Sequence, residues 1–271
     1  MEGHERFFKA NQDLWDKFAK MNYESAMYKT KEFLKGETTL NSIELDEIGD
    51  VQGKTLLHLQ CHFGLDTLSW AREGAIVTGV DFSGEAVQLA RNLANEADLK
   101  ATFIQCNIYN LPDILNEKFD IVFTSYGVHC WLNDLPRWGE IVAHFVKPGG
   151  TFYIAEFHPL LWIFDWDAED DFKMVRGYFH NPLPIELQVD GSYADGTKFA
   201  PQSDYEWAHS MADVINAIVK SGLRIEFMHE FDKTPFPQFS FLKQKDDGYW
   251  YYDNPDVQLP LVYSIKATKV G

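Results

Sequence analysis

Polar side chains follow two apolar segments of the sequence at positions where α/β proteins bind ligands. Residues 56–64 (LLHLQCHFG) pass from an apolar run into a short loop that contains Gln60 and His62. Asp81 ends the next apolar run, AIVTGVD, and lies 81 − 64 = 17 residues after Gly64. A helix that opens after such a loop binds an anionic group, and an acid about 20 residues further on binds ribose hydroxyls. The pair predicts a site for an adenosine-containing cofactor.

The elements around these residues alternate between apolar strands and amphipathic helices. Strands are predicted at TLLHLQ, AIVTGVD, ATFIQC, FDIVFTS and TFYIAEF, and later at LRIEFMHEF and LPLVYSIKAT. Helices are predicted over 65–73, 83–97, 135–145 and 210–222, with Ser83 as an N-cap. Apolar runs bounded by short polar loops are typical of parallel strands buried on both faces. The sequence therefore predicts a doubly wound α/β fold.

Three segments fall outside this alternation. Apolar residues recur at helical spacing in the first ~20 residues, so residues 1–50 are predicted to form a helical lid. The main domain is expected over 51–271, with a β-rich cap inserted at about 157–206. Residues 234–260 are predicted to be a long aromatic loop. Loops of that length in compact domains are usually functional. Six aromatic residues of these segments are candidates for the lining of an acceptor pocket: Trp162, Trp166, Tyr178, Tyr193, Trp250 and Tyr251.

Composition restricts the class of protein. The 271 residues suffice for one sizeable domain. A formal charge of −17, from 24 basic and 41 acidic residues, disfavours nucleic acid and anionic membranes as partners. Three scattered cysteines predict neither a disulfide framework nor a zinc site. With no signal segment and no apolar run of membrane-spanning length, a cytoplasmic protein is expected. No feature indicates an oligomeric state.

From Lys54 to about Lys269 the sequence resembles the class I S-adenosylmethionine-dependent methyltransferases. The resemblance rests on the loop after the first strand, Asp81, QCNIYNLP, FDIVFTSYGVHCWLND and FVKPGGTFYIAEF. It is stronger for the small-molecule, ubiquinone-biosynthesis type, because TSYG stands where adenine methyltransferases carry an NPPY-like tetrapeptide. The resemblance implies a Rossmann-like sheet of seven strands, mostly parallel, with an antiparallel last strand. It also implies S-adenosylmethionine as the cofactor and a small-molecule methyl acceptor.

The resemblance also implies which residues meet the cofactor. The first loop would surround the methionine end, Asp81 would hold the ribose, and Phe82 would lie beside the adenine. The implied cofactor-binding residues are Leu59, Gln60, Cys61, His62, Gly64, Asp81, Phe82, Asn107, Ile108 and Ser125. Family members usually carry an acid where this chain has His58, and glycines where it has Gln60 and His62. Side chains as well as backbone are therefore expected to contact the cofactor.

Methyl transfer from a sulfonium needs orientation, and a base only when the acceptor must lose a proton. His129, Glu156 and His158 follow the fourth and fifth predicted strands, and one of the two histidines is the expected base. Tyr126 completes the catalytic set, because its ring could face the sulfonium. Plainer interpretations stay open: His58 as a core histidine, His62 as a helix cap or a packing residue, and Asp81 as a helix cap.

Other functions are also weighed. A chain that binds S-adenosylmethionine without turnover is the first alternative, and a nicotinamide-dependent oxidoreductase is a weaker one because G-x-G-x-x-G is absent. The acidic run FDWDAEDD is interpreted as a solvated loop rather than a magnesium site, and no metal is predicted. Its carboxylates are Asp165, Asp167, Asp170 and Asp171.

Overall fold

A computed structural model describes residues 4–271 and shows one seven-stranded sheet. The strand order is β3-β2-β1-β4-β5-β12-β8, and β12 runs antiparallel to both of its neighbours while the β3-to-β5 part is parallel. The predicted doubly wound, mostly parallel sheet is confirmed. Its strands are β1 (Thr55–Leu59), β2 (Ile76–Asp81), β3 (Ala101–Gln105), β4 (Phe119–Ser125), β5 (Val146–Phe157), β8 (Leu223–Phe231) and β12 (Val262–Lys269).

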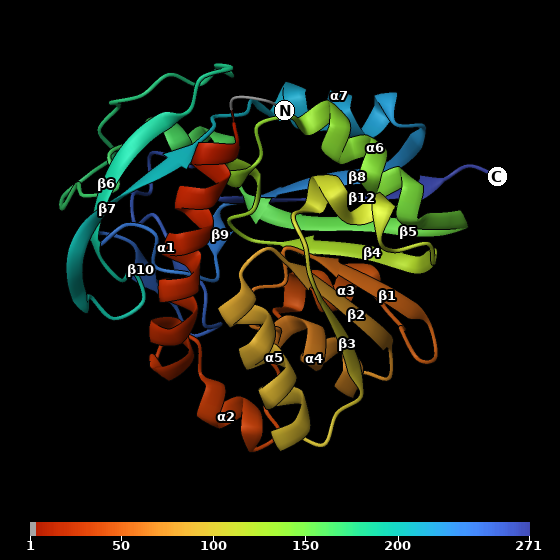
Figure 1. The fold of residues 1–271 in the computed structure, drawn as a ribbon. Helices are drawn as coiled ribbons and strands as arrows, with labels where there is room; N and C mark the ends of the chain where they lie inside the picture. Colours follow the sequence, from red (N-terminus) through yellow and green to blue (C-terminus); the bar gives the residue numbers. More distant parts are fainter. Residues whose placement is uncertain (1–3) are drawn as a thin grey trace.

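Helices cover both faces of the sheet (Figure 1). One face carries α3 (Ser42–Ile48), α4 (Leu65–Arg72) and α5 (Gly84–Glu96), and the other carries α6 (Leu135–Phe145) and α7 (Met211–Lys220). Within residues 4–271, no helix has the length and apolar character that crossing a bilayer requires.

The helix starts follow from local side-chain chemistry. Ser83 caps α5 by accepting a hydrogen bond from the Ala86 amide at 3.0 Å. Ser210 and Asp213 form a reciprocal capping box at the start of α7, as the sequence predicted. Three short 3₁₀ segments follow strands β3, β4 and β5: η1 (Ile108–Asp113), η2 (His129–Trp131) and η3 (Pro159–Ile163).

A long N-terminal helix and a separate hairpin lie beside the carboxyl ends of the parallel strands. Helix α1 (Glu5–Glu24) packs between α5 and the hairpin of β6 (Ile185–Gly191) and β7 (Lys198–Glu206), as Figure 1 shows. The short helix α2 (Thr30–Leu34) follows α1. These are the segments that the sequence predicted as a lid and a cap, although residues 1–3 of the predicted lid lie outside the described residues.

Two segments differ locally from the sequence prediction. The predicted loop over 234–260 is partly ordered as a small sheet of β9 (Lys233–Thr234), β10 (Lys243–Gln244) and β11 (Trp250–Tyr251). Its aromatic side chains bury one another, with Phe239 only 1% exposed, and that packing stabilises what composition alone marks as a loop. The KPGG segment, predicted as a turn before a strand, lies inside β5, where pairing with β4 shifts register.

Candidate active site

The loop between β1 and α4 follows a glycine-type path with only one glycine. Gln60, His62 and Gly64 have φ values of 56°, 51° and 81°. Side chains at positive φ are strained by roughly 1–2 kcal/mol, which glycine avoids. The path is held by two backbone donors: the Cys61 amide donates to the Val80 carbonyl at 2.9 Å, and the His62 amide donates to the Asp81 carboxylate. These two bonds hold Gln60 and His62 in backbone conformations that favour glycine.

Gly64 is required by packing rather than by space for a ligand. A Cβ at this position would lie 2.8 Å from the Phe103 ring and 3.0 Å from the Ala90 Cβ. The end of the loop is thus pressed against β3 and α5, and it places the first turn of α4 against the sheet.

Asp81 lies at the carboxyl end of β2 and joins two loops. Its side chain accepts the His62 amide at 2.8 Å and the Ser83 amide at 2.9 Å, and the residue is 8% exposed. Burial raises the pKa of Asp81 to about 6, while the backbone donors oppose the shift. A carboxylate has about four lone-pair sites, so acceptor capacity for two hydroxyls remains after these two bonds.

Uncommitted polar atoms lie around the same loop. Gln60 donates its Nε2 to the Val128 carbonyl at 3.1 Å, which ties the loop to the segment after β4. Among residues 4–271, the buried Gln60 Oε1, His62 Nε2 and Trp15 Nε1 have no hydrogen-bond partner. Buried polar atoms are rarely left unpaired in proteins, so these three atoms are available to a ligand that binds at the loop.

The His62 ring is enclosed by aromatic side chains from the N-terminal segment. Trp15 and Tyr28 lie with ring centroids 5.2 and 5.3 Å from it, and Trp15 also meets Trp131 at 5.3 Å. Burial lowers the pKa of His62 to about 3, so the ring is neutral at physiological pH. A neutral imidazole and an indole N–H can donate to a carboxylate, and the Gln60 Oε1 can accept from an ammonium. The residues present therefore fit the amino-acid end of S-adenosylmethionine.

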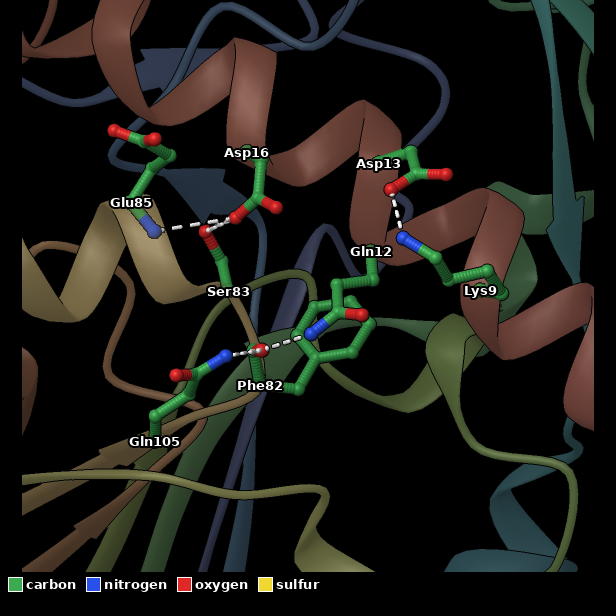
Figure 2. A network of polar contacts seen from close by, with 8 residues as sticks. All are labelled: Lys9, Gln12, Asp13, Asp16, Phe82, Ser83, Glu85 and Gln105. Atoms are coloured by element: carbon green, nitrogen blue, oxygen red, sulfur yellow. Dashed lines mark hydrogen bonds and ion pairs between the residues drawn. The ribbon is translucent and has the colours of Figure 1, made fainter.

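Helix α1 is fastened to the connection between β2 and α5, as Figure 2 shows. Asp16 accepts the Ser83 hydroxyl at 2.6 Å and the Glu85 amide at 3.2 Å, and Gln12 donates to the Phe82 carbonyl at 2.7 Å. Gln12, Trp15 and Asp16 were not predicted as site residues. They are half-buried on α1, and helical periodicity does not show which element they meet.

The side chains of several residues that were predicted to contact the cofactor have structural roles instead. Leu59 and Ile108 are buried in the core below α6, and the thiol of Cys61 is buried near Gly79. Asn107 caps η1 by accepting the Tyr109 amide at 3.0 Å. At these positions the side chains are engaged in packing or capping, so a ligand would meet the backbone atoms.

Ser125 and Tyr126, at the end of β4, are bound to buried acids on the α3 and α4 side. The Ser125 hydroxyl donates to Asp66 at 3.3 Å, and the Tyr126 hydroxyl donates to Glu44 at 3.0 Å. Burial raises the pKa of Glu44 to about 8. Tyr126 therefore faces α3, and the structure does not bring its hydroxyl together with the first loop.

Glu156 organises the segment after β4. Its carboxylate accepts the Val128 amide at 2.7 Å and the His129 amide at 3.3 Å, and it also accepts the amides of Gly127 and Phe157. Burial raises the pKa of Glu156, and these donors oppose the shift. Four backbone donors on one buried carboxyl are typical of a residue that fixes a loop.

The two predicted base candidates differ in their free ring nitrogens. His158 uses both: Nδ1 accepts the Leu160 amide at 3.1 Å and Nε2 lies 2.9 Å from Glu230. The Nδ1 of His129 lies 3.0 Å from the Tyr263 hydroxyl, while its buried Nε2 has no partner among the described residues. Burial lowers the pKa of His129 to about 3 and also lowers that of His158, where Glu230 opposes the shift.

The predicted cap aromatics separate into two groups. Tyr193 joins the N-terminal segment, with its hydroxyl 2.5 Å from that of Tyr28. Trp166 stacks on Phe239 at 5.4 Å and belongs to the small aromatic sheet. Across residues 4–271, no three His, Cys, Asp or Glu side chains are arranged to hold a metal ion.

Comparison with known proteins identifies the family. Residues 56–150 match the family described as a methyltransferase domain. The chain is 31% identical over 186 residues to an uncharacterised methyltransferase of Synechocystis sp., covering 67% of this chain and 84% of that protein. It is 32% identical over 114 residues to a ubiquinone biosynthesis O-methyltransferase of Serratia proteamaculans, covering 41% of this chain and 46% of that protein. The match thus spans about half the length of this relative.

Solved structures share the fold. A Listeria monocytogenes structure described as a putative S-adenosylmethionine-dependent methyltransferase aligns with a TM-score of 0.57 at 20% identity. It covers 84% of this chain and 96% of that one. Together with the seven-stranded sheet and the sequence relatives, this places the chain in the class I S-adenosylmethionine-dependent methyltransferase family.

Proposed function

We propose that this protein transfers a methyl group from S-adenosylmethionine to a small molecule by direct in-line displacement. The observation that carries the proposal is the arrangement of Asp81 and the first loop. One buried carboxylate fixes the loop through the His62 amide and retains acceptor capacity beside three uncommitted polar atoms. This combination suits a ligand with ribose hydroxyls at one end and an amino acid at the other.

The chain's own residues would bind and orient the donor. Asp81 accepts the ribose hydroxyls, and the amide of Gln60 accepts from the ammonium group. His62 and Trp15 donate to the carboxylate through their ring nitrogens. When bound, the cofactor supplies an already activated methyl group, so no covalent enzyme intermediate is needed.

The acceptor would lie between the segment after β4 and the covering elements. Helix α1 and the β6–β7 hairpin exclude water from this edge, and Glu156 holds the backbone of residues 127–129 in place. For an acceptor that must lose a proton, His129 is the better base candidate, because its Nε2 has no partner within residues 4–271. Its lowered pKa makes it a weak base that works only when a ligand changes its surroundings.

The assignment extends to partners and organisation. Residues 1–50 act as a lid on the methyltransferase domain over 51–271, and the cap segment at 157–206 covers the acceptor. The net charge of −17 supports a small-molecule partner rather than nucleic acid or a membrane surface, in a cytoplasmic setting.

Two measurements test the proposal. Calorimetry should show binding of S-adenosylmethionine and S-adenosylhomocysteine but not of NAD, and NAD binding alone would overturn it. Incubation of a metabolite extract with methyl-labelled donor should transfer label to a small molecule. Tight cofactor binding with no transfer to any fraction would favour a binding protein over an enzyme.

A further inference from the structure

The inner face of the β6–β7 hairpin carries two carboxylates in apolar surroundings. Asp204 lies opposite Leu187, and Glu206 lies opposite Ile185. Directly paired side chains share one face of a hairpin, so both acids lie on the side of these apolar residues. Asp204 is only 4% exposed, and this burial raises its pKa, while the Leu187 amide opposes the shift. Glu186, by contrast, lies on the exposed outer face.

These carboxylates adjoin the segment after β4. The Trp207 amide donates to the Cys130 carbonyl at 2.8 Å, which brings the end of β7 against η2. Burial raises the pKa of the Cys130 thiol, and the charges of Glu206, Glu156 and Asp204 raise it further. Three acids from β5 and β7 therefore lie close enough to Cys130 for their charges to act on its pKa.

The neighbouring residue connects this cluster to the cofactor loop. Trp131 packs edge-on against Trp15 at 5.3 Å, and Trp15 in turn packs against His62 at 5.2 Å. Cys130, near the hairpin carboxylates, thus directly precedes Trp131, which packs on the aromatic side chains that cover the loop. This is where an acceptor must bind if it is to meet a methyl group held by that loop.

The hairpin face has acceptors without donors. The buried Asp204 Oδ1 and Gln202 Oε1 have no hydrogen-bond partner among residues 4–271, and a spacing of two residues puts both on the same face. The positive charge of Arg176 acts on Glu206, but its Nη1 donates to the Phe164 carbonyl. Burial raises the pKa of Asp204 to about 7 and that of Glu206 well above its usual range. The Asp204 Oδ1 and the Gln202 Oε1 are the oxygens on this face for which residues 4–271 supply no donor.

Resting on the proposed methyl transfer, we infer that the methyl acceptor is a small cationic molecule whose ammonium or guanidinium group binds Asp204 and Glu206. A cationic nitrogen supplies several N–H donors and no acceptor, which complements the unpaired oxygens of the hairpin. A neutral hydroxyl supplies a single donor, so it leaves either the Asp204 Oδ1 or the Gln202 Oε1 unpaired. The hairpin therefore selects the charge of the acceptor.

The test uses the intact protein, methyl-labelled S-adenosylmethionine and a metabolite extract. Unreacted donor is removed by chromatography, and the labelled product is passed over cation-exchange resin at pH 7. The product should be retained. Asp204→Asn and Glu206→Gln should each raise the KM for the fractionated acceptor at least tenfold. Glu186→Gln, on the exposed face of the same hairpin, should leave the KM unchanged.

S-adenosylhomocysteine affinity serves as the folding and function control, and it should be the same in all four proteins. A neutral or anionic product, or an unchanged KM in both inner-face variants, would overturn this inference while leaving methyl transfer intact. Failure of the unsubstituted protein to bind S-adenosylhomocysteine would instead refute the proposed function.

Discussion

Two buried carboxylate sites, one at the end of β2 and one on the separate β6–β7 hairpin, differ in the donors that they accept. Asp81, at the end of β2, accepts two backbone amides that fix the cofactor loop and the start of α5. Asp204, on the hairpin, has one oxygen with no partner in the described chain, beside a second acid. Burial raises the pKa of both, to about 6 and about 7. The first carboxylate supports the architecture and still has acceptor capacity for a ligand, whereas the second has an oxygen for which the described chain supplies no donor.

The difference shows how each half of the site is prepared. The cofactor half is built from strand ends and backbone amides, so its geometry exists before the ligand binds. The acceptor half is built from a hairpin that, among the described strands, pairs only with itself. We therefore expect substitutions at the first half to change the fold and cofactor affinity, and those at the second to change acceptor affinity.

The largest stability effect is expected for Gly64→Ala. The new Cβ would meet the Phe103 ring at a backbone φ of 81°, so strain and overpacking together should cost about 2–4 kcal/mol of unfolding free energy. Gly196 in the hairpin also has positive φ but no atom within 4 Å of its Cβ position, so Gly196→Ala should cost only about 1 kcal/mol. Urea denaturation compares the two variants. Equal losses of unfolding free energy would show that packing at Gly64 is no tighter than packing at Gly196.

A loss of about 2–3 kcal/mol is expected for Glu156→Gln. The amide NH₂ would face the backbone N–H groups that the carboxylate now accepts, so buried donors would lose partners. Glu230→Gln is the matched control, because that side chain is 53% exposed and should change the unfolding free energy by less than about 0.5 kcal/mol. Denaturation midpoints give both values, and a neutral Glu156→Gln would contradict the loop-fixing role.

Cofactor affinity should fall on acidification. The folded-state pKa of Asp81 is raised to about 6, so the carboxylate is ionised at pH 7.5 and mostly protonated at pH 5. The Kd for S-adenosylhomocysteine should therefore rise about tenfold over this interval. His62, with a pKa of about 3, does not titrate in this range. If Asp204 rather than Asp81 were responsible, Asp204→Asn would abolish the pH dependence, whereas we expect it to persist.

A smaller effect is expected for Asp16→Asn. This change weakens the charge-assisted bonds from Ser83 and Glu85 that fasten α1 (Figure 2), at a cost of about 1 kcal/mol. Hydrogen exchange of α1 amides should become faster, while exchange in α6 should not change. Asp13→Asn, on the same helix but paired with Lys9 of that helix, should leave exchange unaltered.

Metal removal should have no effect. In-line transfer of an activated methyl group needs no Lewis acid, and we expect full activity after incubation with EDTA. Activity lost in EDTA and restored by magnesium would contradict this expectation.

Much of the fold was predictable because apolar periodicity and caps act locally. The succession of strands and helices along the chain, the N-cap at Ser83 and the capping box at Ser210 and Asp213 all follow from short-range chemistry. The path of the loop did not follow from local rules, because Gln60 and His62 adopt positive φ angles that glycine usually occupies. Their strain is offset by tertiary contacts, which a single sequence does not show.

The candidate site was predictable only in part. Asp81 could be placed by its spacing, because strand ends of a parallel sheet share one edge. The roles of Trp15 and Asp204 depend on how α1 and the hairpin dock, and their own segments carry no motif. The side chain of Tyr126 was expected beside the acceptor, yet it turns toward Glu44, because backbone position does not determine side-chain direction at a positive φ of 34°.

The central claim, that the two carboxylate sites divide cofactor and acceptor between them, is tested most directly by one calorimetric comparison. S-adenosylhomocysteine is titrated into the unsubstituted protein, Asp81→Asn and Asp204→Asn, all shown to be folded. Asp81→Asn should weaken binding at least tenfold, since a hydrogen bond to a charged group contributes about 1.5–3 kcal/mol, and Asp204→Asn should leave Kd unchanged. Equal affinity in all three proteins, or equal weakening in both variants, would contradict it.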